Sequence, residues 1–253
     1  MLKVICVLRS GGDYDPRYVV ALGRGVRRHL QGPFEFVCMT DQPEDVSAVC
    51  KDAGIECSVR ILQYDWPGWF AKIEVLEEPG PSLYLDLDTV IVGDISPLAD
   101  AVESLGTEDL IGLSDLYRPK IWQTGIMGWT SPLKGAVERF IARSNNCSWK
   151  FRSGRVYLQT RTYDRYDGDA EWIRPDAEEE GRYLLRAQSF LPGIVSYKSD
   201  VLGLIGKLPP AMTIVCFHGR PRPHELNPIP GWMSTSGWNS RCKQEARREG
   251  REE

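Results

Sequence analysis

The sequence has none of the features that mark a membrane protein or a disulfide-stabilised secreted protein. It contains no run of 18 apolar residues, so no membrane span is predicted. The apolar start at residues 1–8 is too short for a signal peptide and fits a strand better. The seven cysteines are an odd number without a Cys-x-x-Cys pair, and Cys6, Cys38 and Cys216 lie in apolar runs. Buried, reduced thiols and a cytoplasmic location are therefore expected.

A strong charge of one sign is also missing. The formal net charge is -4, which gives no reason to expect nucleic acid or an acidic membrane surface as a partner. No internal repeat occurs, and no linker is long enough to force a domain boundary. We expect one domain over residues 1–237 and a charged C-terminal tail over 238–253.

The chain does contain alternating strand and helix patterns. Strand-like runs at 3–8, 34–39 and 55–62 are separated by helical patterns at 16–30 and 44–53. This alternation predicts an α/β fold with a central, mostly parallel twisted sheet flanked by helices. Ligands of such sheets bind outside the carboxyl ends of the strands. Later elements are predicted as helices at 70–77, 97–105, 132–144 and from 169, strands at 109–113, 122–129, 193–197 and 213–218, and an aromatic, basic flap at 145–168.

Two aspartates stand inside the most apolar stretch, residues 82–92, which predicts one buried central strand. On extended backbone Asp86 and Asp88 point to the same side. Two carboxylates about 5 Å apart repel by roughly 3 kcal/mol at an effective dielectric near 20. A buried strand keeps such a pair only if a positive charge lies between the carboxylates or one of them stays protonated. A divalent cation is the simplest explanation, because hard cations take carboxylate oxygens. The alternative is a strand end at which the aspartates only cap a turn.

A second polar cluster follows the last predicted strand. The protein has three histidines, and two of them, His218 and His224, lie in this short segment. Imidazole binds Mn²⁺ as well as zinc. Gly219 allows close approach of a ligand, and the arginine fork of Arg222 suits phosphate. Taken alone, a histidine such as His218 is more often a hydrogen-bonded structural residue than a metal ligand. Together with Asp86 and Asp88, the ligand interpretation is favoured.

These segments resemble, in the same order, the motifs of family-eight-like glycosyltransferases of the GT-A fold. The resemblance covers roughly residues 3–225. Residues 84–90 (YLDLDTV) carry the Asp-x-Asp motif, 123–127 (QTGIM) are similar to an Asn-(Ser/Ala)-Gly segment, 168–172 (GDAEW) resemble a Gly-Asp-Gln block, 193–198 (GIVSYK) also fit, and 217–224 (FHGRPRPH) resemble a closing Phe-His-Gly-x-Pro-Lys-Pro-Trp block.

The resemblance implies a GT-A-type enzyme that transfers a sugar, with retention, from a nucleotide-diphosphate sugar, usually a UDP-sugar. The acceptor would be a glycan, a lipid-linked sugar or a protein. Residues 1–95 would form the nucleotide-binding half and 96–237 the half for sugar and acceptor. The resemblance implies that Asp86, Asp88 and His218 bind Mn²⁺ or Mg²⁺, with Asp86 also facing the donor. Leu8, Ser10, Gly11 and Asp41 would bind the nucleoside, and Gly219 and Arg222 the phosphates. Lys72, Gln123 and Asp169 would contact the reacting sugar, and Asp169 is the best candidate to lie beside the anomeric carbon.

Four departures from the family pattern bear on these roles. Gln123 replaces asparagine, Ala170 replaces glutamine, Arg222 replaces lysine and His224 replaces tryptophan. They leave the donor-sugar contacts, the acceptor and the mechanism open. A nucleotide-sugar-binding protein without transferase activity is therefore one alternative.

The other alternative is a phosphatase of the haloacid-dehalogenase type. In that class the first aspartate of an Asp-x-Asp-x-(Thr/Val) motif attacks phosphorus, so Asp86 would be the nucleophile and Asp88 the acid/base. That motif normally follows the first strand, however, and His218 would have no role. A sugar nucleotidyltransferase fits less well, because no Gly-rich, Lys-containing segment follows the first strand.

Overall fold

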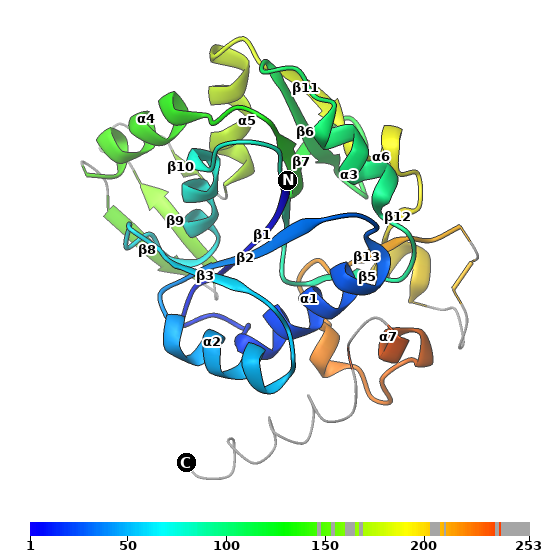
Figure 1. Cartoon of the computed structure of the whole chain (residues 1–253). Coiled ribbons are helices and arrows are strands. Elements are labelled where there is room, and N and C mark those ends of the chain that lie inside the picture. Colours follow the sequence, from blue (N-terminus) through cyan, green and yellow to red (C-terminus); the bar gives the residue numbers. More distant parts are fainter. Residues whose placement is uncertain are drawn as a thin grey trace.

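A computed structural model describes residues 1–145, 148–152, 155–159, 165–166, 169–202, 208–209, 211–235 and 238 (Figure 1). The elements in chain order are β1 (Leu2–Leu8), α1 (Pro16–His29), β2 (Phe34–Thr40), α2 (Pro43–Asp52), β3 (Ser58–Ile61), η1 (Gly68–Glu77), β4 (Ser82–Leu85), β5 (Thr89–Ile91), α3 (Ser96–Glu103), β6 (Asp109–Ser114), β7 (Trp122–Trp129), α4 (Lys134–Ser144), β8 (Ser148–Arg152), β9 (Arg155–Gln159), β10 (Arg165–Tyr166), α5 (Ala170–Glu179), β11 (Tyr183–Arg186), α6 (Ala187–Phe190), β12 (Ile194–Ser196), η2 (Tyr197–Val201), β13 (Ile214–Cys216), η3 (Pro223–Glu225) and α7 (Gly231–Thr235).

The centre of the molecule is a seven-stranded sheet with the order β11-β6-β7-β4-β1-β2-β3. β1 pairs in parallel with β2 and β4, and β2–β3 and β6–β11 are parallel as well. Only β7 runs against both of its neighbours, β4 and β6. The predicted α/β fold with a mostly parallel central sheet is confirmed.

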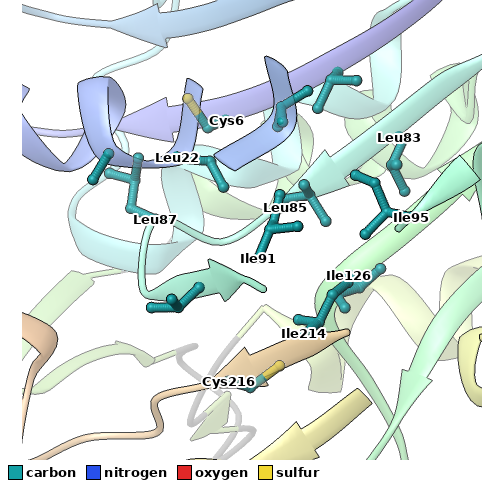
Figure 2. Close-up of a cluster of buried hydrophobic side chains, with 14 of the residues drawn as sticks. Cys6, Leu22, Leu83, Leu85, Leu87, Ile91, Ile95, Ile126, Ile214 and Cys216 are labelled. Carbon is teal, nitrogen blue, oxygen red and sulfur yellow. The ribbon is translucent and has the colours of Figure 1, made fainter. Parts of the chain in front are cut away.

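Both faces of this sheet are buried, as expected from the apolar central strands. On β1, Val4 and Cys6 face one hydrophobic cluster, whereas Ile5 faces a second cluster on the opposite side. Figure 2 shows the first cluster, where Leu22 of α1 and Ile214 of β13 meet the sheet. The second cluster is formed with η1, α4 and α5. Residues at the end of a central strand can therefore receive partners from either layer.

The prediction of one continuous strand over residues 82–92 is wrong. β4 ends at Leu85, and the Thr89 amide donates to the Asp86 carbonyl at 3.1 Å, which closes a turn. β5 then pairs with β13 in a separate three-stranded sheet. The alternative of a strand end followed by a turn gives the correct backbone. Asp86 and Asp88 are therefore not neighbours on one face of a strand.

Three other expectations need correction. β3 starts only at Ser58, because Ile55 is used to end α2 through a hydrogen bond to the Cys50 carbonyl. The helix expected at 70–77 is a 3₁₀ helix that begins at Gly68. The expected flap contains β8, β9 and β10, which form a small antiparallel sheet.

Some expectations lie outside the described residues, namely Gly168 and the tail beyond Trp238. Within the described ranges, no helix combines the length and apolar character needed to cross a bilayer. The division of residues 1–237 into two halves stays a prediction.

Gly112 of β6 offers a direct stability test. A Cβ atom at this position would lie 1.9 Å from the ring of buried Trp122. Gly112→Ala should therefore lower the free energy of unfolding by about 3 kcal/mol, because the ring has no space to move into. Gly231→Ala is the matched control, since in the described part of the chain no atom beyond its neighbours and its own helix backbone lies within 4 Å of the added Cβ. Urea denaturation measures both, and equal midpoints for the two variants would contradict this packing.

Candidate active site

The candidate site lies at the carboxyl ends of three adjacent parallel strands. β4, β1 and β2 are neighbours in the sheet, and Leu8 is in register with Thr40. The next residues along these strands are Asp86, Arg9 and Asp41. The connection after β13 brings His218 and Arg222 to the same edge, because β13 pairs with β5 directly after the Asp86–Asp88 turn.

Lys72 links two of the predicted site carboxylates. Its Nζ lies 2.7 Å from Asp86 Oδ1 and 3.3 Å from Asp169 Oδ2. The Tyr84 hydroxyl also donates to Asp86 Oδ1 at 2.7 Å. Lys72 reaches Asp86 because η1 covers the sheet face to which Tyr84 points. Burial lowers the pKa of Lys72, but Asp169 and Asp86 outweigh this effect and raise it, so Lys72 stays charged.

Asp169 is held at the start of α5. The Thr124 hydroxyl donates to its Oδ2, the oxygen that also faces Lys72. Its carbonyl accepts from the amides of Trp172 and Ile173, at 3.0 and 2.8 Å. A carboxylate at a helix N-terminus is favoured by the helix dipole. With the side chain of Asp169 only 10% exposed, the structure places a fixed anion opposite Asp86.

Asp88 has different partners from Asp86. Its Oδ2 accepts from the Tyr14 hydroxyl at 2.6 Å and from Arg222 Nη1 at 2.9 Å. Burial raises the pKa of Asp88 to about 7 and Asp86 adds to the effect, while Tyr14, Arg222 and Lys72 act against it. The Asp88 carboxylate is thus a costly anion in this site, and a cation beside it would stabilise the charged form.

His218 follows β13 and is partly buried beside Tyr117, with 5.7 Å between the ring centroids. Its Nε2 is buried and has no hydrogen-bond partner among the described residues. Burial lowers the pKa of His218, although Asp115 and Asp86 partly oppose this shift. A neutral imidazole with a free nitrogen is able to bind a metal ion.

The predicted nucleoside residues form a cluster of their own. Asp41 accepts from the Ser10 amide at 2.9 Å, from the Ser10 hydroxyl, and from Arg9 Nη1 at 2.7 Å. Burial raises the pKa of Asp41, but the Ser10 hydrogen bonds and Arg9 lower it below its usual value. Leu8 is buried at the end of β1, and Gly11 has a positive φ of 79°. Asp41 therefore orders the loop after β1.

Gln123 is not brought to the Lys72 cluster. Its Nε2 donates to Asp115 Oδ2 at 3.1 Å. Asp115 Oδ1 also accepts from the amides of Tyr117 and Arg118, at 2.9 and 2.7 Å. Gln123 thus stabilises the turn that carries Tyr117 next to His218.

The fit of a cation to this site is supported by the donor chemistry and by the free His218 nitrogen. Yet no three His, Cys, Asp or Glu side chains of the described chain come close enough together to hold a metal ion. Asp88 is instead engaged by Arg222. The metal site of Asp86, Asp88 and His218 therefore stays a prediction, as do the individual roles of the other site residues.

Sequence reasoning missed three hydroxyl groups that contact the site carboxylates. They belong to Tyr14, Tyr84 and Thr124. Tyr84 was detectable in principle, because it lies two residues before Asp86 on the same strand face. Thr124 belongs to the QTG segment without being assigned a role there. Tyr14 gave no signal, since its contact joins residues 74 positions apart.

No protein-family model matches the chain, and neither does any curated protein sequence. The fold is similar to the glycosyltransferase GlyE of Streptococcus pneumoniae TIGR4, with a TM-score of 0.58 and 12% identity over 99% of this chain and 65% of GlyE. The apo form of GlyE gives a TM-score of 0.59 and 15% identity, over 98% of this chain and 63% of the GlyE chain. The galactosyltransferase LgtC, solved with donor and acceptor sugar analogues, gives a TM-score of 0.56 and 10% identity, over 93% of this chain and 95% of LgtC.

The chain therefore spans less than two thirds of GlyE but nearly the whole length of LgtC. At these identities the likeness establishes the fold. The predicted GT-A-type fold is confirmed, and the solved structures that share it here are glycosyltransferases.

Proposed function

We propose that this protein is a glycosyltransferase that takes a sugar from a UDP-sugar in a reaction that depends on Mn²⁺ or Mg²⁺. The observation that carries the proposal is the group of Asp86, Asp169 and Lys72 at the carboxyl end of β4, within a fold otherwise seen here in glycosyltransferases. Asp88 and the free nitrogen of His218 lie at the same edge and supply suitable donors for the cation.

Transfer requires that negative charge on the leaving diphosphate be stabilised. A bound divalent cation supplies this stabilisation as a Lewis acid. Arg222 of the chain itself would add a positive charge beside the metal ion at the same edge of the sheet. Gly219, with a φ of 65°, lets the backbone approach a phosphate closely.

Lys72 and Asp169 are proposed to orient the donor sugar. The side-chain contacts of Asp169 with Thr124 and Lys72 are both made through Oδ2. Within the described chain, Oδ1 therefore remains available to accept a sugar hydroxyl. We further propose transfer with retention, on the resemblance of the five sequence segments, with a glycan, lipid-linked sugar or protein as acceptor.

The phosphatase alternative is less well supported. Asp88, the acid/base of that alternative, is paired through its Oδ2 with Arg222. The alternative also gives His218 no role. The absent glutamine at Ala170 keeps a binding protein without transferase activity as the second candidate.

A thermal-shift screen of nucleotide-sugars with and without Mn²⁺ tests the proposal. We expect the melting temperature to rise with UDP-sugars only when Mn²⁺ is present, because a ligand that binds the folded state stabilises it. Release of UDP in the presence of candidate acceptors then separates a transferase from a binding protein. No response to any nucleotide-sugar, together with phosphate release from small phosphomonoesters, would favour the phosphatase.

A further inference from the structure

Arg222 stands where a divalent cation is expected at Asp88. Its Nη1 lies 2.9 Å from Asp88 Oδ2, and its Nε lies 3.2 Å from Asp13 Oδ2. The guanidinium carbon is 4.8 Å from the centroid of the Tyr14 ring. An arginine fork can bind two carboxylates at once and stack on an aromatic face, whereas the lysine expected at this position offers a single ammonium.

The charges around Asp86 and Asp88 show why the Asp88–Arg222 ion pair is needed in the absence of a cation. Lys72 is committed to Asp86 and Asp169. Asp88 therefore depends on Arg222 as its nearest counter-ion in the described chain. With their side chains only 13% and 18% exposed, Asp88 and Arg222 compensate each other largely without water.

The backbone around Arg222 is fixed independently of this ion pair. The Arg222 amide donates to Glu225 Oε2 at 2.7 Å, and η3 begins at Pro223. The guanidinium can thus leave Asp88 by side-chain rotation alone. Asp13 is 41% exposed and also pairs with Arg220, so it is a weak second anchor.

We infer that Arg222 is a resident counter-ion that the divalent cation must displace from Asp88, and that the donor diphosphate receives the displaced guanidinium. Cation alone then binds weakly, because it competes with Arg222. Cation and nucleotide together bind strongly, because Arg222 exchanges one anion for another. This inference rests on the proposed function and adds to it a coupling between the metal and the donor.

The test compares Arg222→Met with Arg220→Met. Methionine keeps the unbranched stem of arginine but carries no charge. Arg220 is the matched control, because it pairs with Asp13 and Glu225 but not with Asp88. Binding of Mn²⁺ alone, and of Mn²⁺ in the presence of UDP, is measured from the electron paramagnetic resonance signal of free Mn²⁺.

We expect Arg222→Met to bind Mn²⁺ alone about tenfold more tightly than the wild type, since Asp88 loses its competing cation. The factor by which UDP tightens Mn²⁺ binding should fall by about tenfold, and Arg220→Met should leave both values unchanged. Should Arg222→Met fail to fold, Arg222→Lys provides the second variant. It keeps the charge but loses the fork, so Mn²⁺ alone should bind a few times more tightly.

Unchanged Mn²⁺ affinity in the Arg222 variants, with normal UDP binding by the wild type, would overturn the inference and leave the proposed function intact. A wild type that binds no UDP at any Mn²⁺ concentration would overturn the proposed function, and the inference with it.

Discussion

Asp88→Ala is expected to abolish sugar transfer, with a loss of at least about 10³-fold in kcat, and to remove metal-dependent donor binding. The reason is that Asp88 contributes one of two carboxylates to the proposed cation site and has no substitute there. In the enzyme without cation and donor, Arg222 would also lose the partner that holds it at the site. Turnover is measured as UDP release over a Mn²⁺ titration.

The loss should come from the site and not from unfolding. Burial and Asp86 raise the pKa of Asp88 to about 7, so at neutral pH the folded state carries a carboxyl group that is unfavourable to ionise. Removal of Asp88 takes away this unfavourable carboxylate, but it also deprives Arg222 and the Tyr14 hydroxyl of a partner. The melting temperature should therefore fall by a few degrees, and the variant should remain folded under assay conditions. Asp45→Ala, an exposed change on α2, is the control. Metal-dependent turnover by Asp88→Ala at the wild-type rate would refute the assignment.

The elements that the sequence predicts best are those with strong local periodicity. β1, α1, β2 and α2 follow the expected order, since each is defined by its own apolar pattern and by turn residues such as Gly32 and Gly54. The break after Leu85 was not predictable in this way. Residues 89–92 are as apolar as the strand before them, and they leave the central sheet because β5 finds its partner β13 more than 120 positions later.

The candidate site shows the same division between local and long-range information. The spacing of Asp86 and Asp88 and the late position of His218 can be seen in the sequence. The pairing of these residues cannot, because it depends on the layer that each side chain enters. Asp86 pairs with Lys72, which η1 supplies, whereas Asp88 pairs with Arg222, which lies in the segment that follows β13. A sequence motif treats the aspartates as equivalent, and the fold gives them different counter-ions.

Lys72→Met is expected to have the second largest effect, on both catalysis and stability. The substitution leaves Asp86 and Asp169 without the ammonium that lies 2.7 and 3.3 Å from them. Loss of one partner from a buried ionic group costs about 3 kcal/mol of unfolding free energy. We also expect kcat/KM to fall by about 10³-fold, because both carboxylates lose the charge that fixes them beside the donor sugar.

A double-mutant cycle with Asp169→Asn separates these two effects. Once the Asp169 charge is gone, the Lys72 ammonium has one carboxylate fewer to neutralise, so Lys72→Met should cost about 1–2 kcal/mol less stability in the Asp169→Asn background than in the wild type. Urea denaturation of the four proteins measures this coupling, and kcat/KM of the same proteins shows whether the two residues act as one unit on the substrate. Strictly additive stability losses would mean that the Lys72–Asp169 contact contributes nothing, and the orientation of the donor sugar would then have to depend on Asp86 alone.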